Sequence, residues 1–229
     1  MVSITLEEMF FARVHFGHLA KRQNPKMQKY VFERRGSIQI IDLVQTGKLL
    51  LQACNFLSSS AQNSKTILFV GTKRQAASII AQEASRCKSF YINHRWLGGI
   101  LTNWATIRTQ VQLLKQLELK EENGVLDLLP KQEASRLRRQ LDKLRMFLGG
   151  IKNMTKLPDI VIVVDLKREY NAILECHKLN IPVVGLVDTN CDPDLLDWPI
   201  PGNDDSILSI NYIISKLADA IIEGTNFLI

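Results

Sequence analysis

The stretch Asp159-Ile160-Val161-Ile162-Val163-Val164 decides the fold class, because β-branched residues follow one another in it without a polar residue between them. A strand of this composition is typical of a parallel sheet whose two faces are both covered by helices. Similar apolar runs occupy residues 37–41, 66–70, 89–93 and 182–187. We expect these five segments to be the strands of one parallel sheet.

Helix-length segments separate most of these strands. Apolar residues recur at helical spacing from Leu43 to Leu57 and from Ala77 to Ala84. A last helix is expected from Asp204 to Glu223, with Asn203 as its N-cap. Alternating strands and helices predict an α/β fold, with a Rossmann-like parallel sheet and helices on both faces.

A long segment without any strand pattern interrupts this alternation. Apolar residues form one stripe from Trp104 to Leu117 and another from Ala134 to Leu148, the second with the alternating spacing of three and four that is typical of coiled coils. Residues 121–130 read as the turn between them, and Gly149-Gly150 ends the second helix. We therefore predict a sheet domain of residues 1–102 and 150–229, with a basic N-terminal arm at about 1–36. An antiparallel coiled-coil hairpin is expected as an insertion at 103–149.

Composition restricts the function classes. The four cysteines are far apart in the sequence and form no CxxC pair, which argues against a disulfide scaffold or a zinc finger. The apolar runs are too short to span a membrane, and the N-terminus, with Glu7 and Glu8, lacks a signal core. We therefore expect no membrane partner and a protein that works in the compartment where it is made.

Charge is segregated along the chain. Residues 1–156 carry 25 Lys and Arg against 11 Asp and Glu, whereas residues 157–229 carry 4 against 12. Segregation of this size concerns the partners of a protein rather than its fold. We expect a polyanion to contact the first two thirds of the chain, and the acidic last third to face protein or solvent.

The motifs of nucleotide-binding enzymes are absent. The turn Gly71-Thr72-Lys73-Arg74 lacks the glycine spacing of a phosphate loop, and no GxGxxG motif occurs. Acids at predicted strand ends leave one catalytic alternative open, a metal-dependent hydrolase or phosphotransferase that uses Asp165, Asp188 and Asp192. The same residues are common in turns and caps, and we favour that interpretation because no nearby Lys, His or Arg completes a reaction centre. His15 and His18 have helical metal-ligand spacing but no further ligand at such spacing.

Basic and planar residues instead favour nucleic-acid binding. Residues 13–35 interleave Lys and Arg with His, Phe and Tyr, which suits contacts with phosphates and exposed bases. Lys73-Arg74 and His94-Arg95 follow two predicted strands, so a parallel sheet would place both pairs at one edge. Trp96 and Phe16, taken singly, are interpreted more readily as core aromatics.

Nine motifs, in order from about residue 5 to residue 224, resemble one family. They include Val14-His15-Phe16-Gly17-His18, Asn24-Pro25-Lys26-Met27, Asn93 to Gly99 (NHRWLGG) and Ile200 to Asp205 (IPGNDD). The sequence is similar to the bacterial-type ribosomal protein two of the small subunit. Stretches around 158–165, 169–170 and 188–194 resemble the plastid branch of that family.

This resemblance implies a structural component of the small ribosomal subunit, without catalysis, cofactor or small-molecule substrate. It implies that the protein binds ribosomal RNA near the junction between the head and the body of the subunit. It also implies contacts with neighbouring ribosomal proteins. It also implies that the protein is located in a plastid and is made inside that organelle. The alternative location is the cytoplasm of a bacterium. A nucleic-acid-binding module that acts off the ribosome is a third hypothesis. The residues that we expect to contact RNA are His18, Lys21, Arg22, Lys26, Lys29, Arg34, Arg35, Lys73, Arg74, Arg95, Trp96 and Arg108.

Overall fold

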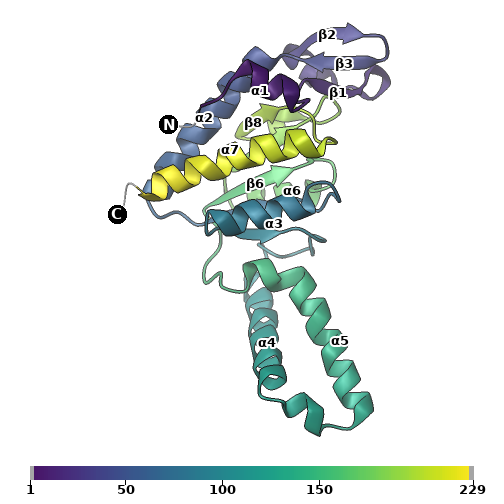
Figure 1. Ribbon diagram of the computed structural model, residues 1–229, viewed down its shortest axis with the longest axis vertical. Helices are drawn as coiled ribbons and strands as arrows, with labels where there is room; N and C mark the ends of the chain where they lie inside the picture. The colour runs from purple at the N-terminus through teal and green to yellow at the C-terminus, as the bar shows by residue number, and fades with distance from the viewer. Residues whose placement is uncertain (1–2, 227–229) are drawn as a thin grey trace.

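The computed structural model describes residues 3–226 and contains a parallel sheet, a smaller antiparallel sheet and a pair of long helices (Figure 1). The strands are β1 (Phe16–Leu19), β2 (Val31–Arg35), β3 (Ile38–Ile41), β4 (Ile67–Val70), β5 (Phe90–Ile92), β6 (Ile160–Val164), β7 (Val183–Val187) and β8 (Trp198–Pro201). The α-helices are α1 (Leu6–Phe11), α2 (Leu43–Gln62), α3 (Ala77–Arg86), α4 (Trp104–Glu122), α5 (Lys131–Leu148), α6 (Tyr170–Lys178) and α7 (Ile207–Asn226).

The main sheet has the order β5-β4-β6-β7-β8, and every neighbouring pair is parallel. Its β-branched strands are buried on both faces. Ile160 and Ile162 of β6 pack on one side with α2, α3 and α7, whereas Val161 and Val163 pack on the other side with α6. The expected Rossmann-like α/β class, with helices on both faces, is confirmed.

Two strands differ from the expectation. The segment 37–41 is not part of the parallel sheet, because β3 pairs antiparallel with both β1 and β2. The turn at Gly36, where φ is +63°, reverses the chain directly before β3, and a reversal this tight joins only antiparallel strands. The fifth parallel strand is β8 instead. The sequence does not predict β8 because Pro199 and Pro201 cannot donate backbone hydrogen bonds within a sheet. They are tolerated here because β8 lies at the edge of the sheet.

The last helix begins at Ile207, three residues later than expected from the sequence. The side-chain oxygen of Asn203 does accept backbone hydrogen bonds, from the N–H groups of Asp205 and Ser206. These bonds form a turn ahead of the helix rather than its cap. Asp204 is buried in that turn, with 1% of its surface exposed.

Helices α4 and α5 run side by side in opposite directions and extend from one end of the molecule, while the antiparallel sheet lies at the other end (Figure 1). Leu114 of α4 and Leu141 of α5 are fully buried in their contact. At the base of α5, a Cβ atom at Gly150 would lie 2.1 Å from the carbonyl oxygen of Tyr91, so only glycine permits this close approach to β5. The division into domains at residues 102 and 150 stays a prediction.

None of the helices within residues 3–226 has the length and hydropathy that crossing a bilayer requires.

Candidate nucleic-acid interface

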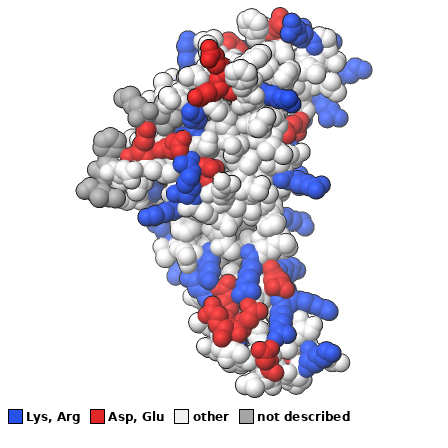
Figure 2. Space-filling view, in the orientation of Figure 1, with Lys and Arg blue, Asp and Glu red and all other residues white. Residues whose placement is uncertain are grey.

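The carboxyl ends of β4, β5 and β6 meet at one edge of the sheet because these strands are adjacent and parallel. Val70 at the end of β4 pairs with Ile92 of β5 and with Val163 of β6. The loops that leave this edge carry exposed cations, which we call the carboxyl-edge cations: Arg74, Arg95, Lys167 and Arg168. Figure 2 shows Lys and Arg side chains along much of the right-hand side of the molecule, the side toward which the arrowhead of β6 points in Figure 1.

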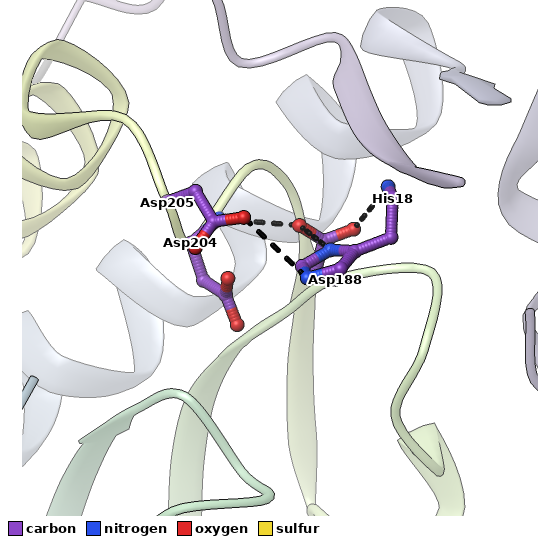
Figure 3. Close-up of side chains that lie close together, drawn as sticks. All are labelled: His18, Asp188, Asp204 and Asp205. Atoms are coloured by element: carbon purple, nitrogen blue, oxygen red, sulfur yellow. Dashed lines mark hydrogen bonds and ion pairs between the residues drawn. The ribbon is translucent and has the colours of Figure 1, made fainter. Parts of the chain in front are cut away.

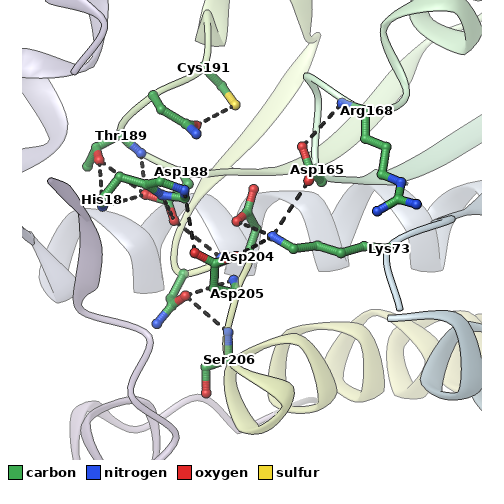
Figure 4. A network of polar contacts seen from close by, with 12 residues as sticks. His18, Lys73, Asp165, Arg168, Asp188, Thr189, Cys191, Asp204, Asp205 and Ser206 are labelled. Carbon is green, nitrogen blue, oxygen red and sulfur yellow. Dashed lines mark hydrogen bonds and ion pairs between the residues drawn. The ribbon is translucent and has the colours of Figure 1, made fainter. Parts of the chain in front are cut away.

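Lys73 does not belong to this exposed set. Its ammonium lies 2.8 Å from Asp204, 2.7 Å from Asp205 and 3.5 Å from Asp165, and only 8% of the residue is exposed (Figure 4). Burial acts to lower the pKa of Lys73, but hydrogen bonds to Asp204 and Asp205 outweigh it and raise the pKa above its ordinary value. Lys73 ties the β4 loop to the acidic turn before α7, and its expected contact with phosphate stays a prediction.

His18 also points inward. Its Nδ1 lies 2.8 Å from a carboxylate oxygen of Asp188, and its Nε2 lies 3.4 Å from Asp205 (Figure 3). The hydrogen bond with Asp188 is the largest cause that raises the pKa of His18, and burial opposes it. Burial, together with the carboxylates of Asp188 and Asp165, raises the pKa of Asp204 to about 7. The ring of His18 is held by Asp188 and Asp205, and its expected contact with a base or sugar stays a prediction.

The acids of the proposed hydrolase do not come together as one centre. Asp192 is bound by Lys26 at 2.7 Å, Asp165 faces Lys73, and Asp188 holds His18. The residues that could hold a divalent metal are a different set, His18, Asp188, Asp204 and Asp205, whose ligand atoms all lie within 4.8 Å of one another. His15 is not among them. It is buried and stacks on Phe10 with ring centroids 4.6 Å apart.

Trp96 fixes the loop that carries Arg95. Its indole N–H donates to Glu175 of α6 at 2.9 Å, and the same carboxylate accepts from the backbone N–H groups of Gly99, Leu101 and Thr102 at 2.8–3.1 Å. Only 9% of Trp96 is exposed, which favours a core role for this side chain, and its expected contact with a base stays a prediction. The sequence analysis missed Glu175, because nothing in the spacing of the two segments indicates that they meet.

The N-terminal arm presents most of its predicted cations to solvent. Lys21, Arg22, Arg34 and Arg35 are exposed around the antiparallel sheet, and so is Arg108 on α4. Two further cations are exposed but have acidic neighbours: Lys26 pairs with Asp192 and Asp194, and the ammonium of Lys29 lies 3.8 Å from Asp194. Whether these residues contact RNA stays a prediction.

The sequence analysis also missed two of the carboxyl-edge cations. Lys167 and Arg168 lie in the loop after β6, three and four residues beyond Val164. The Arg168 guanidinium donates to the hydroxyl of Thr72 in the β4 loop at 3.1 Å. Residues 157–229 have a negative net charge, so the two cations are not evident when the charge of the whole segment is considered. Their position after a buried strand, the same signal that was used for Arg74 and Arg95, could have identified them.

Exposed cations gathered around one sheet edge attract polyanions such as nucleic acids. A family model described as ribosomal protein S2 matches residues 9–224. The chain belongs to the ribosomal protein S2 family.

Individual relatives match over nearly the whole chain. The small ribosomal subunit protein uS2c of Cyanophora paradoxa is 63% identical over 226 residues, which cover 99% of this chain and 97% of that protein. The uS2c protein of Guillardia theta is 62% identical over 98% of this chain and 95% of its own length. The uS2 protein of the cyanobacterium Nostoc punctiforme is also 62% identical, over 98% of this chain and 85% of its own length.

Family membership decides several expectations. The chain is a structural ribosomal protein and not an enzyme, as expected, and the hydrolase alternative has no support. As a small-subunit ribosomal protein, the chain has ribosomal RNA and other ribosomal proteins as its partners. Plastid-encoded relatives support the expected plastid location, and the cyanobacterial relatives are compatible with the bacterial alternative.

Proposed function

We propose that this chain is built into a plastid small ribosomal subunit and that it binds the ribosomal RNA through the carboxyl-edge cations and the cations of the N-terminal arm. One observation carries the proposal: the loops after three neighbouring strands all present exposed guanidinium or ammonium groups at the same edge of the sheet. Such groups neutralise phosphates and release counterions, which gives binding that weakens with salt. The guanidinium groups can also engage a phosphate through two parallel N–H donors.

The framework behind this edge supports the proposal. Glu175 holds the loop of Arg95 through four different donor residues, and Lys73 holds the β4 loop against the turn before α7. Side chains presented by fixed loops lose less conformational entropy on binding than side chains on mobile ones. The buried residues at this edge therefore act by positioning the exposed cations.

The test compares charge removal at the edge with charge removal elsewhere. R74Q/R95Q should lower the slope of log K against log salt by roughly 1.5 units, since each lost phosphate contact is worth about 0.7–0.9. The control K48Q/K178Q removes two exposed lysines from α2 and α6 and should leave the slope nearly unchanged. Equal slopes for R74Q/R95Q and the control would refute the assignment of RNA binding to this edge.

Co-sedimentation separates this proposal from a module that acts off the ribosome. The full chain should remain with small subunits in sucrose gradients at moderate salt and dissociate as the salt concentration rises. A chain that binds free RNA but never sediments with small subunits would favour the off-ribosome hypothesis.

Protein neighbours are the second part of the proposal, and one observation favours them. Beside α1 lies an apolar hollow of about 720 Å³, lined by Phe10, Phe11 and Phe32 among others, and Phe11 and Phe32 are 77% and 70% exposed. Exposed aromatic patches of this kind mark protein contacts. F11S/F32S should lose chemical cross-links to an adjacent ribosomal protein while it keeps the RNA salt slope. Unchanged cross-links would contradict this part.

A further inference from the structure

An exposed aromatic side chain lies at the carboxyl edge of the main sheet. Tyr170 is the first residue of α6 and follows the loop after β6, and 47% of the residue is exposed, compared with 9% for Trp96. Within residues 3–226, its ring stacks on no other aromatic ring and its hydroxyl makes no hydrogen bond. Single exposed aromatic residues are common on protein surfaces, so the surroundings of Tyr170 decide its role.

Leu174 extends the exposed apolar surface of Tyr170. The two residues are four positions apart and are therefore neighbours on one face of α6, and Leu174 is 45% exposed. Ala172, Ile173 and Cys176 are fully buried and anchor α6 on the main sheet. We call the exposed surface of Tyr170 and Leu174 the α6 platform.

Two of the carboxyl-edge cations border the α6 platform. Lys167 and Arg168 lie in the loop directly before α6 and are exposed. Among the described residues, neither has a carboxylate within ion-pair distance. Of the two acids in the same loop, Asp165 faces Lys73 and Glu169 is buried. The surface beside the platform is therefore positively charged.

Hydrogen bonds hold the loop that carries these cations. The carboxylate of Glu169 accepts from the backbone N–H of Thr72 at 2.8 Å, and the hydroxyl of Thr72 accepts from the Arg168 guanidinium at 3.1 Å. The backbone N–H of Arg168 donates to Asp165 at 3.3 Å (Figure 4). The loop is thus held in place before any partner binds, which reduces the entropy lost on binding.

We propose that the ring of Tyr170 stacks on an unpaired base of the RNA, while Lys167 and Arg168 bind the phosphates that flank this nucleotide. Aromatic side chains stack on bases in loops, bulges and ends, because the bases of a regular duplex are already stacked on one another. Every base has a π face, so this contact selects an unpaired nucleotide rather than a sequence.

RNA fits the α6 platform better than a protein does. Two cations without acidic partners border the ring, and charged residues are depleted at the centres of protein interfaces. The inference rests on the proposed function, and it adds the kind of RNA that the carboxyl edge recognises, which is a strand with an unpaired nucleotide.

The test measures binding of the full chain to small-subunit ribosomal RNA. Y170A should weaken the affinity by about tenfold, the usual effect of removing a ring that stacks on one base. The salt slope should not change, because no charge is removed. Y170F keeps the ring and should bind within about twofold of the unaltered chain, whereas Y170L, which keeps apolar area without a ring, should bind as weakly as Y170A.

The control L51A truncates an apolar residue of α2 that is 46% exposed, on the other face of the main sheet. It should change the affinity by less than about twofold. Circular dichroism should show the same helix content for all variants, because alanine and leucine favour a helix at least as much as tyrosine does.

Competition between two short RNAs tests the nature of the stacked base. A duplex with one bulged nucleotide should displace ribosomal RNA from the unaltered chain better than the same duplex fully paired, and Y170A should abolish this preference. Equal competition by the two duplexes with the unaltered chain would contradict stacking on an unpaired base.

The outcomes separate this inference from the proposed function. Weaker binding by Y170A at an unchanged salt slope, together with a lower slope for R74Q/R95Q, supports both. A lower slope for R74Q/R95Q with normal binding by Y170A overturns the stacking and leaves the proposed function standing. If neither variant alters binding, both are wrong. Normal binding by Y170L, or loss by Y170A of a cross-link to a ribosomal protein at unchanged RNA affinity, would show that the α6 platform makes an apolar contact instead.

Discussion

Replacing Glu175 by alanine tests how the edge is held together. Its carboxylate accepts hydrogen bonds from three part-buried N–H groups, those of the Trp96 indole, Gly99 and Leu101, and from the backbone and hydroxyl of Thr102. Each part-buried donor that loses its partner costs about 1 kcal/mol, the lower end of the usual range, because water reaches this loop. Glu175→Ala should therefore lower the free energy of unfolding by about 3 kcal/mol at pH 7.

The pH dependence of this loss has a definite sign. Burial acts to raise the pKa of Glu175, but the hydrogen bonds from Trp96 and the backbone outweigh it and lower the pKa below its ordinary value. A carboxyl group with a depressed pKa in the folded state stabilises the protein above its unfolded pKa, about 4.3, and this stabilisation is lost as the pH falls through the folded pKa. The difference between Glu175→Ala and the unaltered chain should therefore be constant from pH 7 to about pH 5 and shrink below pH 4.

Urea unfolding followed by circular dichroism measures both quantities. Glu122→Ala serves as the control because Glu122 is an exposed acid on α4, and surface changes of this kind stay within about 0.5 kcal/mol. A loss below 1 kcal/mol for Glu175→Ala, or a loss that persists unchanged at pH 3, would refute the role assigned to this carboxylate.

Three further changes test the packing of the framework. Gly150→Ala should destabilise the chain by about 2 kcal/mol or more in urea unfolding, because its Cβ would lie 2.1 Å from the carbonyl oxygen of Tyr91. Gly149→Ala is the control, because a Cβ atom there meets open space and should leave the stability unchanged. Equal effects of the two substitutions would contradict this account. Leu141→Ala, which removes a fully buried side chain, should lower the free energy of unfolding by about 2–4 kcal/mol and speed hydrogen exchange in α4 and α5 more than in the sheet. Equal acceleration in the helices and the sheet would contradict the packing of Leu141 between α4 and α5. Asp42→Ala removes the N-cap of α2 and should cost about 1 kcal/mol, measured as a shift in the urea midpoint, and no shift would count against the cap.

Local pattern was sufficient to predict most of the main sheet. Runs such as 159–164 are too uniformly β-branched for a solvated strand, so their burial between two layers of helices follows from composition alone. The antiparallel position of β3 could not be predicted in this way. Its pairing depends on the tight turn at Gly36 and on β1, whose Gly-His sequence gives little strand signal.

The site was predictable in position but not in detail. Parallel strands bring their carboxyl ends together, so the sequence alone predicts that Arg74 and Arg95 lie at one edge of the sheet. The burial of Lys73 could not be predicted, because it depends on Asp204 and Asp205, which lie 131 or more residues away in the sequence. A charged side chain can be buried only where oppositely charged partners compensate for its desolvation. Its burial therefore cannot be predicted until those partners are known.

The most direct test of the central claim is tethered hydroxyl-radical cleavage in assembled small subunits. Single cysteines at Arg95 and Ser85 would carry the iron chelate, since the native cysteines are buried and Ser85 lies near the end of α3, away from the carboxyl edge. Our account predicts strand cleavage of ribosomal RNA from position 95 and little from position 85. Cleavage from position 85 with none from position 95 would show that the RNA lies elsewhere and would contradict the account.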